Sequence, residues 1–269
     1  MVKSRSFVLR SAVLAFSALL IGCSALSFDD DAPVRTSARK GADFEIRQPS
    51  KTAVEGIDVS YFQETVNWNA VAGDNIRFAY IKATEGGDRV DQRFYDNFTG
   101  ARQAGVLRGA YHFWYHCRSG AEQAAWYIQN VPRDPSALPP VLDIEWTPTS
   151  PTCTKRPAAA TLHADMQAFL DTVEAYYGKR PVIYTTIDFY QDRLADGAFS
   201  NYPLWVRSTA AEPHERYGKR PWHFWQYTST GRVAGVPGKT DRNVFNGSEA
   251  AFQQFLANSN TAPAMMAER

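Results

Sequence analysis

The sequence predicts an α/β protein whose globular part is a single irregular (β/α) barrel of the TIM type. Three observations carry this prediction. Between Val54 and Leu256, short apolar runs typical of buried strands alternate with segments of helical periodicity. That stretch holds about 200 residues, a length that one closed barrel fills. Acidic residues also recur where the expected strands end, at the rim where barrel enzymes build their active sites.

The expected strands are runs rich in aromatic and β-branched residues. Several of them are almost continuously apolar, as strands buried on both faces should be. In chain order they are Gly56–Val59, Phe78–Ala83, Gly109–Trp114, Pro140–Trp146, Pro181–Thr185, Leu204–Arg207 and His223–Tyr227.

Segments between these runs carry apolar residues three and four positions apart, which predicts helices on the outside of the barrel. Two of the segments are followed by a glycine, Gly105 and Gly178, which is a helix stop signal. From Leu204 onward the gaps are too short for full helices, so we expect short antiparallel hairpins near the end. The helical segments are Asp91–Ala104, Ala121–Asn130 and Ala158–Tyr177.

The first 22 residues have the parts of a secretory signal peptide, with basic residues at positions 3, 5 and 10 before the apolar stretch Ser11–Gly22. A helix of that stretch would be about 18 Å long, too short to cross a bilayer. The stretch leads into Leu20–Cys23, which resembles the bacterial lipoprotein box, where the cysteine becomes the acylated first residue of the mature protein. We therefore expect Cys23 to carry lipid; an ordinary signal peptide with an incidental cysteine is the alternative.

Composition and net charge limit the class of protein to which the chain can belong. There are 29 Lys and Arg against 28 Asp and Glu, and 13% of the residues are aromatic, which excludes disorder as the general state. The balanced charge argues against nucleic acid as a partner, and we expect a monomer. Residues 23–53 lack apolar periodicity and are predicted to be a tether, residues 54–258 the barrel domain, and residues 259–269 a disordered tail.

Two carboxylates on one expected strand are the strongest candidates for catalysis. Asp143 and Glu145 lie two positions apart in an apolar run, so they share a face and point into the barrel. Repulsion and lost solvation raise the pKa of at least one, favouring an acid beside an ionised partner, as glycoside hydrolysis requires. Asp58 lies on another strand. Asp241 is a weaker catalytic candidate, since a turn or an ion pair with Arg242 would explain its presence. For each of these carboxylates the alternative is a purely structural role, as a charge-paired residue at the end of a strand.

Aromatic residues at the strands form a second group. Aromatic rings offer apolar faces to sugars and could form the base of a glycan-binding groove. Most aromatic residues on the strands of a barrel, however, belong to its core. His112 and His116 lie four residues apart, but no cysteine or carboxylate completes a zinc site with them, so we expect no metal and no cofactor. The aromatic positions are Tyr111–Trp114, Tyr184, Trp205 and Trp222–Tyr227.

A series of short motifs, in order along the chain, resembles glycoside hydrolase family 25, the Chalaropsis-type lysozymes or N-acetylmuramidases. Jointly the motifs are highly specific, whereas singly only the D-x-E and G-I-D-V-S motifs carry much weight. They run through nearly the whole expected domain. They are Gly56–Ser60 with Gln63 and Trp68, Phe78–Gly86, Gly109–Phe113, Val141–Glu145, Pro181–Thr185, Leu204–Val206, Trp225–Tyr227 and Thr240–Phe245.

The resemblance implies five βα units followed by mostly antiparallel strands, and hydrolysis of the β-1,4 bond between N-acetylmuramic acid and N-acetylglucosamine in peptidoglycan. It implies that Glu145 is the general acid and that the other acidic residues of the site are Asp58, Asp143 and Asp241. Arg207 stands where an alanine is more usual, which affects local substrate contacts rather than the catalytic set. The residues implied to line the sugar groove are Tyr111, Tyr184, Trp205 and Gln226.

Two mechanisms fit these residues. Asp143 attacks the anomeric carbon, or it orients the substrate's N-acetyl group as nucleophile while Glu145 protonates the leaving oxygen; we favour net retention with substrate assistance. Two other functions stay open, a non-catalytic peptidoglycan-binding lipoprotein and a hydrolase of another glycan such as chitin. A binding module would not need both Asp143 and Glu145, which argues against it. The expected location is a membrane facing the periplasm or cell envelope, the outer membrane if the cell is Gram-negative.

The remaining cysteines are predicted to pair. If Cys23 carries lipid, Cys117 and Cys153 are the only pair left, and export places them where disulfides persist. They follow consecutive strands of a parallel barrel, which are usually neighbours, so both loops should open on the same rim. Two free thiols on separate loops are the alternative.

Overall fold

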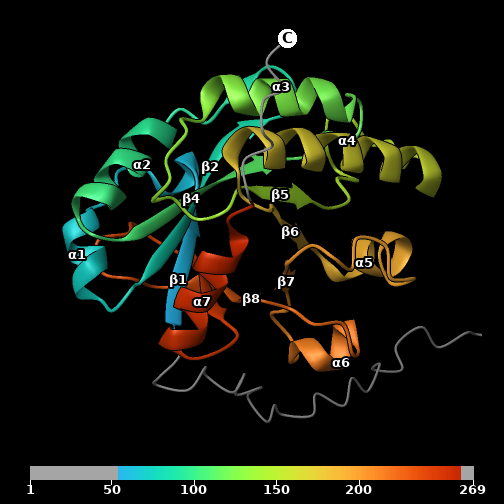
Figure 1. Cartoon of the computed structure of the whole chain (residues 1–269). Helices are drawn as coiled ribbons and strands as arrows, with labels where there is room; N and C mark the ends of the chain where they lie inside the picture. The colour runs from blue at the N-terminus through green and yellow to red at the C-terminus, as the bar shows by residue number, and fades with distance from the viewer. Residues whose placement is uncertain (1–53, 262–269) are drawn as a thin grey trace, which may run out of the picture. The chain divides into compact units, whose positions relative to one another are not determined.

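Eight strands close into a barrel in the computed structural model, which describes residues 54–261 (Figure 1). Side chains alternate between the barrel interior and the surrounding helices, as the apolar strand sequences require. In order around the barrel the strands are β1 (Val54–Val59), β2 (Phe78–Glu85), β4 (Leu107–Phe113), β5 (Val141–Ile144), β6 (Val182–Thr185), β7 (Leu204–Arg207), β8 (Phe224–Gly231) and β9 (Thr240–Phe245). The two-residue strand β3 (Arg89–Val90) pairs only with β2.

The predicted single irregular barrel is confirmed, but its antiparallel part is smaller than the resemblance implied. Strand β7 still runs parallel to β6, and β8 runs parallel to β7. Of the barrel strands, β9 alone runs opposite to the others, antiparallel to both β8 and β1. Connection length explains the difference, because a parallel crossover needs about a dozen residues or more. Sixteen residues separate β7 from β8, whereas eight separate β8 from β9 and leave room only for a hairpin.

Helices follow the first six barrel strands and one more ends the described chain. The three predicted helices correspond to α2 (Phe94–Gln103), α3 (Gly120–Asn130) and α4 (Ala159–Tyr177). Gly178 ends α4 in the left-handed conformation (φ 65°), which glycine adopts without strain. The remaining helices were not predicted from the sequence; they are α1 (Trp68–Gly73), α5 (Ile187–Arg193), α6 (Pro213–Tyr217) and α7 (Glu249–Ser259), with a 3-10 turn, η1 (Tyr61–Gln63), after β1.

The strands separate two apolar cores. The outer core lies between strands and helices, where Leu142 and Ile144 of β5 meet Phe169 of α4. The inner core fills the amino-terminal half of the barrel with aromatic rings, among them Phe78 and Phe224, whose centroids lie 5.4 Å apart. Helix α7 covers this end of the barrel and inserts the fully buried Phe252.

The described chain stays packed past residue 258, where the barrel domain was predicted to end. Helix α7 continues to Ser259, whose carbonyl accepts a hydrogen bond from the amide of Arg180 at 2.8 Å. The amide of Thr261 donates to Gly178 at 2.9 Å. The predicted signal peptide (1–22), Cys23 and the tether lie outside the described residues, as do residues 262–269. Within residues 54–261 no helix is both long and apolar enough to span a membrane.

Candidate active site

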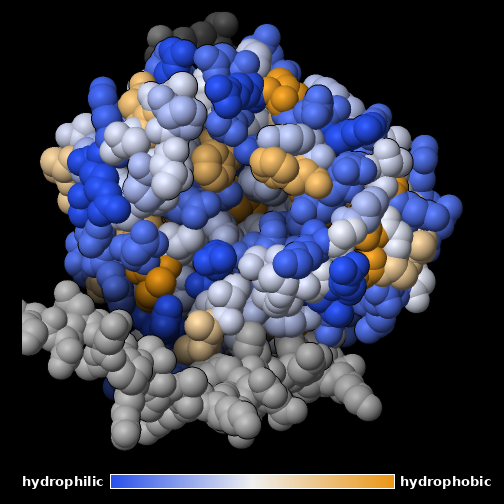
Figure 2. Space-filling model, turned by 180° about the vertical axis from the view of Figure 1, so that it is seen from behind, coloured by the Kyte–Doolittle hydropathy of each residue, from blue (hydrophilic) through white to orange (hydrophobic). Residues whose placement is uncertain are grey.

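A cleft of about 690 Å³ opens at the carboxyl end of the parallel strands. Helix α7 lies toward the viewer in Figure 1 and covers the opposite end; the face seen from behind is hollowed near its centre (Figure 2). The alternation of side chains along each strand determines which residues line the cleft, because the last inward-facing residue of a barrel strand points into it. All eight predicted catalytic and substrate-binding residues line it: Asp58, Tyr111, Asp143, Glu145, Tyr184, Trp205, Gln226 and Asp241.

Asp58 is held by two side-chain amides. Its Oδ2 accepts hydrogen bonds from Gln226 Nε2 at 2.9 Å and from Asn243 Nδ2 at 2.8 Å. Trp205 Nε1 donates to Asn243 Oδ1 at 2.8 Å, and the Tyr184 hydroxyl donates to Gln226 Oε1 at 3.0 Å. An indole N–H can only donate, so Asn243 must turn its NH₂ toward Asp58. Burial raises the pKa of Asp58, and the two amide donors oppose that rise.

Tyr184 and Trp205 therefore contribute more through their polar atoms than through their ring faces. They are only 6% and 2% exposed, which leaves little ring surface for a sugar. Their hydrogen bonds orient the amides that hold Asp58. Tyr111 is half-buried and leaves more of its surface in the cleft.

One carboxylate oxygen of Asp143 lies in the cleft without a hydrogen-bond partner in the described part of the chain. Asp143 is 8% exposed, and the unpartnered oxygen is its buried Oδ1. Burial raises the pKa of Asp143 well above its usual value, and the negative charge of Glu145 raises it further. A buried acceptor without a hydrogen-bond donor destabilises the ligand-free protein, and a donor on a bound ligand would satisfy it.

Glu145 and Asp241 titrate far above ordinary carboxyls. Burial raises the pKa of Glu145 to about 7, although the positive charge of Arg207 opposes the rise. Burial, followed by the charge of Asp58, raises the pKa of Asp241 to about 8. Asp58 and Asp241 lie directly opposite each other on β1 and β9, where like charges repel. The cleft thus holds protonated carboxyl groups near neutral pH.

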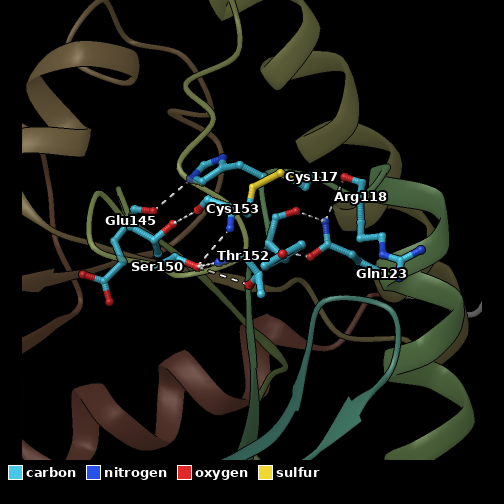
Figure 3. Close-up of a disulfide and its surroundings, with 10 residues drawn as sticks. Cys117, Arg118, Gln123, Glu145, Ser150, Thr152 and Cys153 are labelled. Atoms are coloured by element: carbon cyan, nitrogen blue, oxygen red, sulfur yellow. Dashed lines mark hydrogen bonds between the residues drawn. A yellow bond between two sulfur atoms is a disulfide. The ribbon is translucent and has the colours of Figure 1, made fainter.

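The backbone of Glu145 is fixed from the neighbouring loop. His116 Nε2 lies 2.9 Å from the carbonyl oxygen of Glu145 and donates to it. The next residue, Cys117, forms a disulfide with Cys153 of the loop after β5, with a Cα–Cα distance of 6.0 Å. Figure 3 shows the Glu145 carboxylate pointing away from this disulfide. The Ser150 hydroxyl oxygen accepts from the Cys153 amide at 3.2 Å and ties the loop to itself.

Comparison with known proteins places the chain in a family. The family described as Glycosyl hydrolases family 25 matches residues 57–236, from β1 past β8. The chain belongs to glycosyl hydrolase family 25.

Relatives resemble this family 25 chain over most of their length. It is 40% identical over 222 residues to Lysozyme M1 of Streptomyces globisporus, covering 78% of this chain and 74% of that protein. A bacterial lysozyme of Streptomyces coelicolor superposes with a TM-score of 0.68 at 39% identity, covering 78% of this chain and 98% of the other. A family 25 glycosyl hydrolase of Bacillus anthracis gives a TM-score of 0.71 at 34% identity, covering 77% and 95%.

Several residues that line or support the cleft of this family 25 member were not identified from the sequence. Asn243 lies two residues from Asp241 on one strand, so the spacing that joined Asp143 to Glu145 would have found it. Lys82 and Glu85 line the cleft and bind each other at 2.8 Å. No sequence signal distinguished Phe62, which also lines the cleft, from a core aromatic residue.

The two histidines four residues apart do not share a site. Burial lowers the pKa of His112 to about 4, and its ring nitrogens bond to Thr84 and Gln123 in the outer core. His116 contacts Glu145 instead. Within residues 54–261, no three His, Cys, Asp or Glu side chains are grouped so as to hold a metal ion.

Proposed function

We propose that this family 25 member is a peptidoglycan hydrolase, which cleaves the β-1,4 bond between N-acetylmuramic acid and N-acetylglucosamine. The observation that carries the proposal is the pairing of Glu145, whose pKa is raised to about 7, with the unpartnered Asp143 in one open cleft. Glycoside hydrolysis needs a protonated carboxyl beside a second carboxylate. Relatives named lysozyme and N,O-diacetylmuramidase support the choice of glycan.

In the proposed mechanism Glu145 donates its proton to the leaving glycosidic oxygen. Asp143 accepts a hydrogen bond from the N–H of the substrate's acetamido group and directs that group's oxygen onto the anomeric carbon as the glycosidic bond breaks. Water, which gives its proton to Glu145, then opens the cyclic intermediate from the side that the leaving group vacated, so the two displacements give net retention with substrate assistance. The unpartnered Oδ1 of Asp143 supports this role, since it lacks the donor that an acetamido N–H would supply. A hydrogen bond to Asp143 also stabilises its ionised form, so that the proton resides on Glu145.

The product decides between this proposal and its alternatives. Incubation of the purified protein with purified peptidoglycan should create new reducing ends of muramic acid. New N-acetylglucosamine reducing ends, or binding without cleavage, would contradict the proposal, and parallel incubation with chitin tests the other glycan. The first-formed anomer, followed by NMR, should retain its configuration; an inverted anomer would exclude both the substrate-assisted and the direct-attack mechanism.

We further propose that Cys23 anchors the enzyme by lipid to a membrane facing the periplasm or cell envelope. The lipoprotein-like Leu20–Cys23 motif after a short apolar stretch supports this location. A single acyl chain anchors weakly, so more than one is expected. Fractionation should recover the protein with membranes, and Cys23→Ser should block lipid attachment. A wholly soluble wild-type protein without lipid mass would contradict the anchor.

Size-exclusion chromatography of a Cys23-lacking protein tests the expected monomer.

A further inference from the structure

An exposed aromatic pair stands beside the cleft, in the turn η1 directly after β1. Phe62 is 71% exposed, more than any other large apolar side chain in the described part of the chain, and Tyr61 is 39% exposed. Their ring centroids are 4.1 Å apart and their planes differ by 32°. At that distance and angle one face of Phe62 lies against Tyr61, while most of the Phe62 side chain stays exposed to solvent.

Hydrogen bonds hold this turn in place. The Gln63 side chain accepts from the Ser60 amide at 2.9 Å, and Asp91 Oδ2 accepts from the Tyr61 amide at 2.9 Å. Glu64, which ends the turn, has φ 52°, a conformation that a non-glycine residue seldom adopts. Such strain persists where surrounding structure enforces it, often at ligand sites. The ring of Phe62 is therefore presented on a rigid backbone.

A second hollow of about 270 Å³ adjoins the catalytic cleft at this turn. Three residues, Phe62, Lys82 and Glu85, line both hollows and form the wall between them. A chain of sugars that leaves the carboxylates in this direction would therefore cross Phe62. The other lining residues of the second hollow are Tyr61, Arg89, Val90, Asp91 and Gln92.

Charges in the second hollow cancel. Glu85 pairs with Lys82 at 2.8 Å and with Arg89 at 3.4 Å. Asp91 accepts two backbone hydrogen bonds, from the amides of Tyr61 and Arg93, both at 2.9 Å. Two cations and two carboxylates leave no net charge to attract an ionic ligand, while their polar atoms and Gln92 offer hydrogen bonds to hydroxyl groups.

We propose that this hollow is a further subsite, which binds an uncharged N-acetylhexosamine ring of the glycan strand against the exposed ring of Phe62. The proposal rests on the proposed function and adds a place beyond the sugars that lie over the carboxylates. A pyranose ring has an apolar C–H face for the aromatic ring and a polar edge for the ion pairs. A stem peptide carries carboxylates, for which the balanced charges of the hollow hold no counter-ion.

The test compares strands of different length. Glu145→Gln in the full chain slows cleavage about 10²–10⁴-fold, so calorimetry can measure its binding to peptide-free glycan strands of four and eight sugars before they are cut. We expect the longer strand to bind about tenfold more tightly, which corresponds to one aromatic–sugar contact. Adding Phe62→Ala should abolish this gain, and adding Phe62→Trp should preserve it. Tyr176→Ala, at an exposed tyrosine of α4, is the matched control and should leave the gain unchanged.

Three outcomes would overturn the subsite: no gain with length, a gain that survives Phe62→Ala, or a gain that requires strands bearing stem peptides. Wild-type protein assayed on the same strands keeps the two proposals apart. Failure to cleave any strand refutes the proposed hydrolase. Cleavage together with an absent or Phe62-independent length effect refutes only the subsite.

Discussion

The two halves of the barrel interior are built on the same strands but differ in chemistry. In the amino-terminal half, inward positions carry Phe78, Tyr80 and Phe224, and Gly56 leaves room for the ring of Phe78, since a Cβ there would lie 2.4 Å from it. Two or four residues further along, the inward positions carry Asp58 and Lys82. One half stabilises the fold through packed rings, whereas the other gathers buried carboxyl groups.

This difference shows that one strand can carry residues that stabilise the fold and, a few positions further along, residues that serve the chemistry. Packed aromatic rings contribute several kcal/mol each, whereas buried carboxyls with raised pKa values cost stability at neutral pH. Substitutions in the two halves should therefore have opposite signatures. Changes in the half that holds the carboxyl groups, the mouth, should lower activity without unfolding the protein. Changes in the half packed with aromatic rings, the floor, should destabilise the fold without altering the chemistry.

The largest expected effect is at the mouth. Glu145→Gln removes the proton donor and nearly preserves shape, so we expect a rate about 10²–10⁴-fold lower on peptidoglycan, with an unchanged or higher Tm. Glu249→Gln, at an exposed residue on α7, is the control and should keep wild-type activity. Wild-type turnover by a folded Glu145→Gln protein would remove Glu145 from its proposed role.

At the floor the expected loss is of stability. Phe252 of α7 is fully buried and lies 5.1 Å from Phe245 and 5.7 Å from Phe78, measured between ring centroids. Phe252→Ala should cost about 3–5 kcal/mol of unfolding free energy in urea titration. Phe255→Ala, at a partly buried ring of the same helix, should cost less. Activity per folded molecule should stay near wild type; a loss as large as that of Glu145→Gln would show that the two halves are not separable.

The same contrast explains what could be predicted from the sequence. Strands with apolar inward residues were recognisable, and so were Asp143 and Glu145, because an apolar frame surrounds them. Strand β9 was not expected as a strand, since its inward Asp241 and Asn243 give it the polar pattern of a turn. The short helices α1 and α5, of six and seven residues, provide less than two full turns of periodicity.

Other parts of the site depend on barrel closure and could not be read from local patterns. The bond from Asn243 to Asp58 joins positions 185 residues apart, and it exists because β9 pairs with β1. The exposure of Phe62 has a similar origin. Its sequence context is that of many core aromatics, and only the direction of the turn after β1 leaves the ring in solvent.

A smaller effect is expected at the rim, where the disulfide joins the loops after β4 and β5. Cys117→Ser with Cys153→Ser should lower the unfolding free energy by about 3–4 kcal/mol, because the bridge restricts the unfolded chain between positions 36 residues apart. Activity should fall only severalfold, since His116 still bonds to the Glu145 carbonyl. The comparison is urea unfolding of wild type with and without reductant, against the double variant. Identical stability in all three, or alkylation of both thiols in the untreated Cys23-lacking protein, would contradict the bridge.

The smallest effect concerns the stability cost of the carboxyls at the mouth, and its sign depends on pH. The pKa of Asp241 is raised to about 8 in the folded protein, against 3.8 ordinarily. The folded state therefore holds a proton that the unfolded chain releases, so stability is fully present below about pH 4 and is lost as pH rises toward 8. Asp241→Asn carries no titrating proton, and its unfolding free energy relative to wild type should rise over that range. We expect a gain on the order of 1–2 kcal/mol, since partial exposure screens the carboxyl. Asp196→Asn, at an exposed aspartate, should show no such trend. A gain that is flat with pH would mean that Asp241 is ionised in the folded mouth and that this half of the barrel carries no such cost.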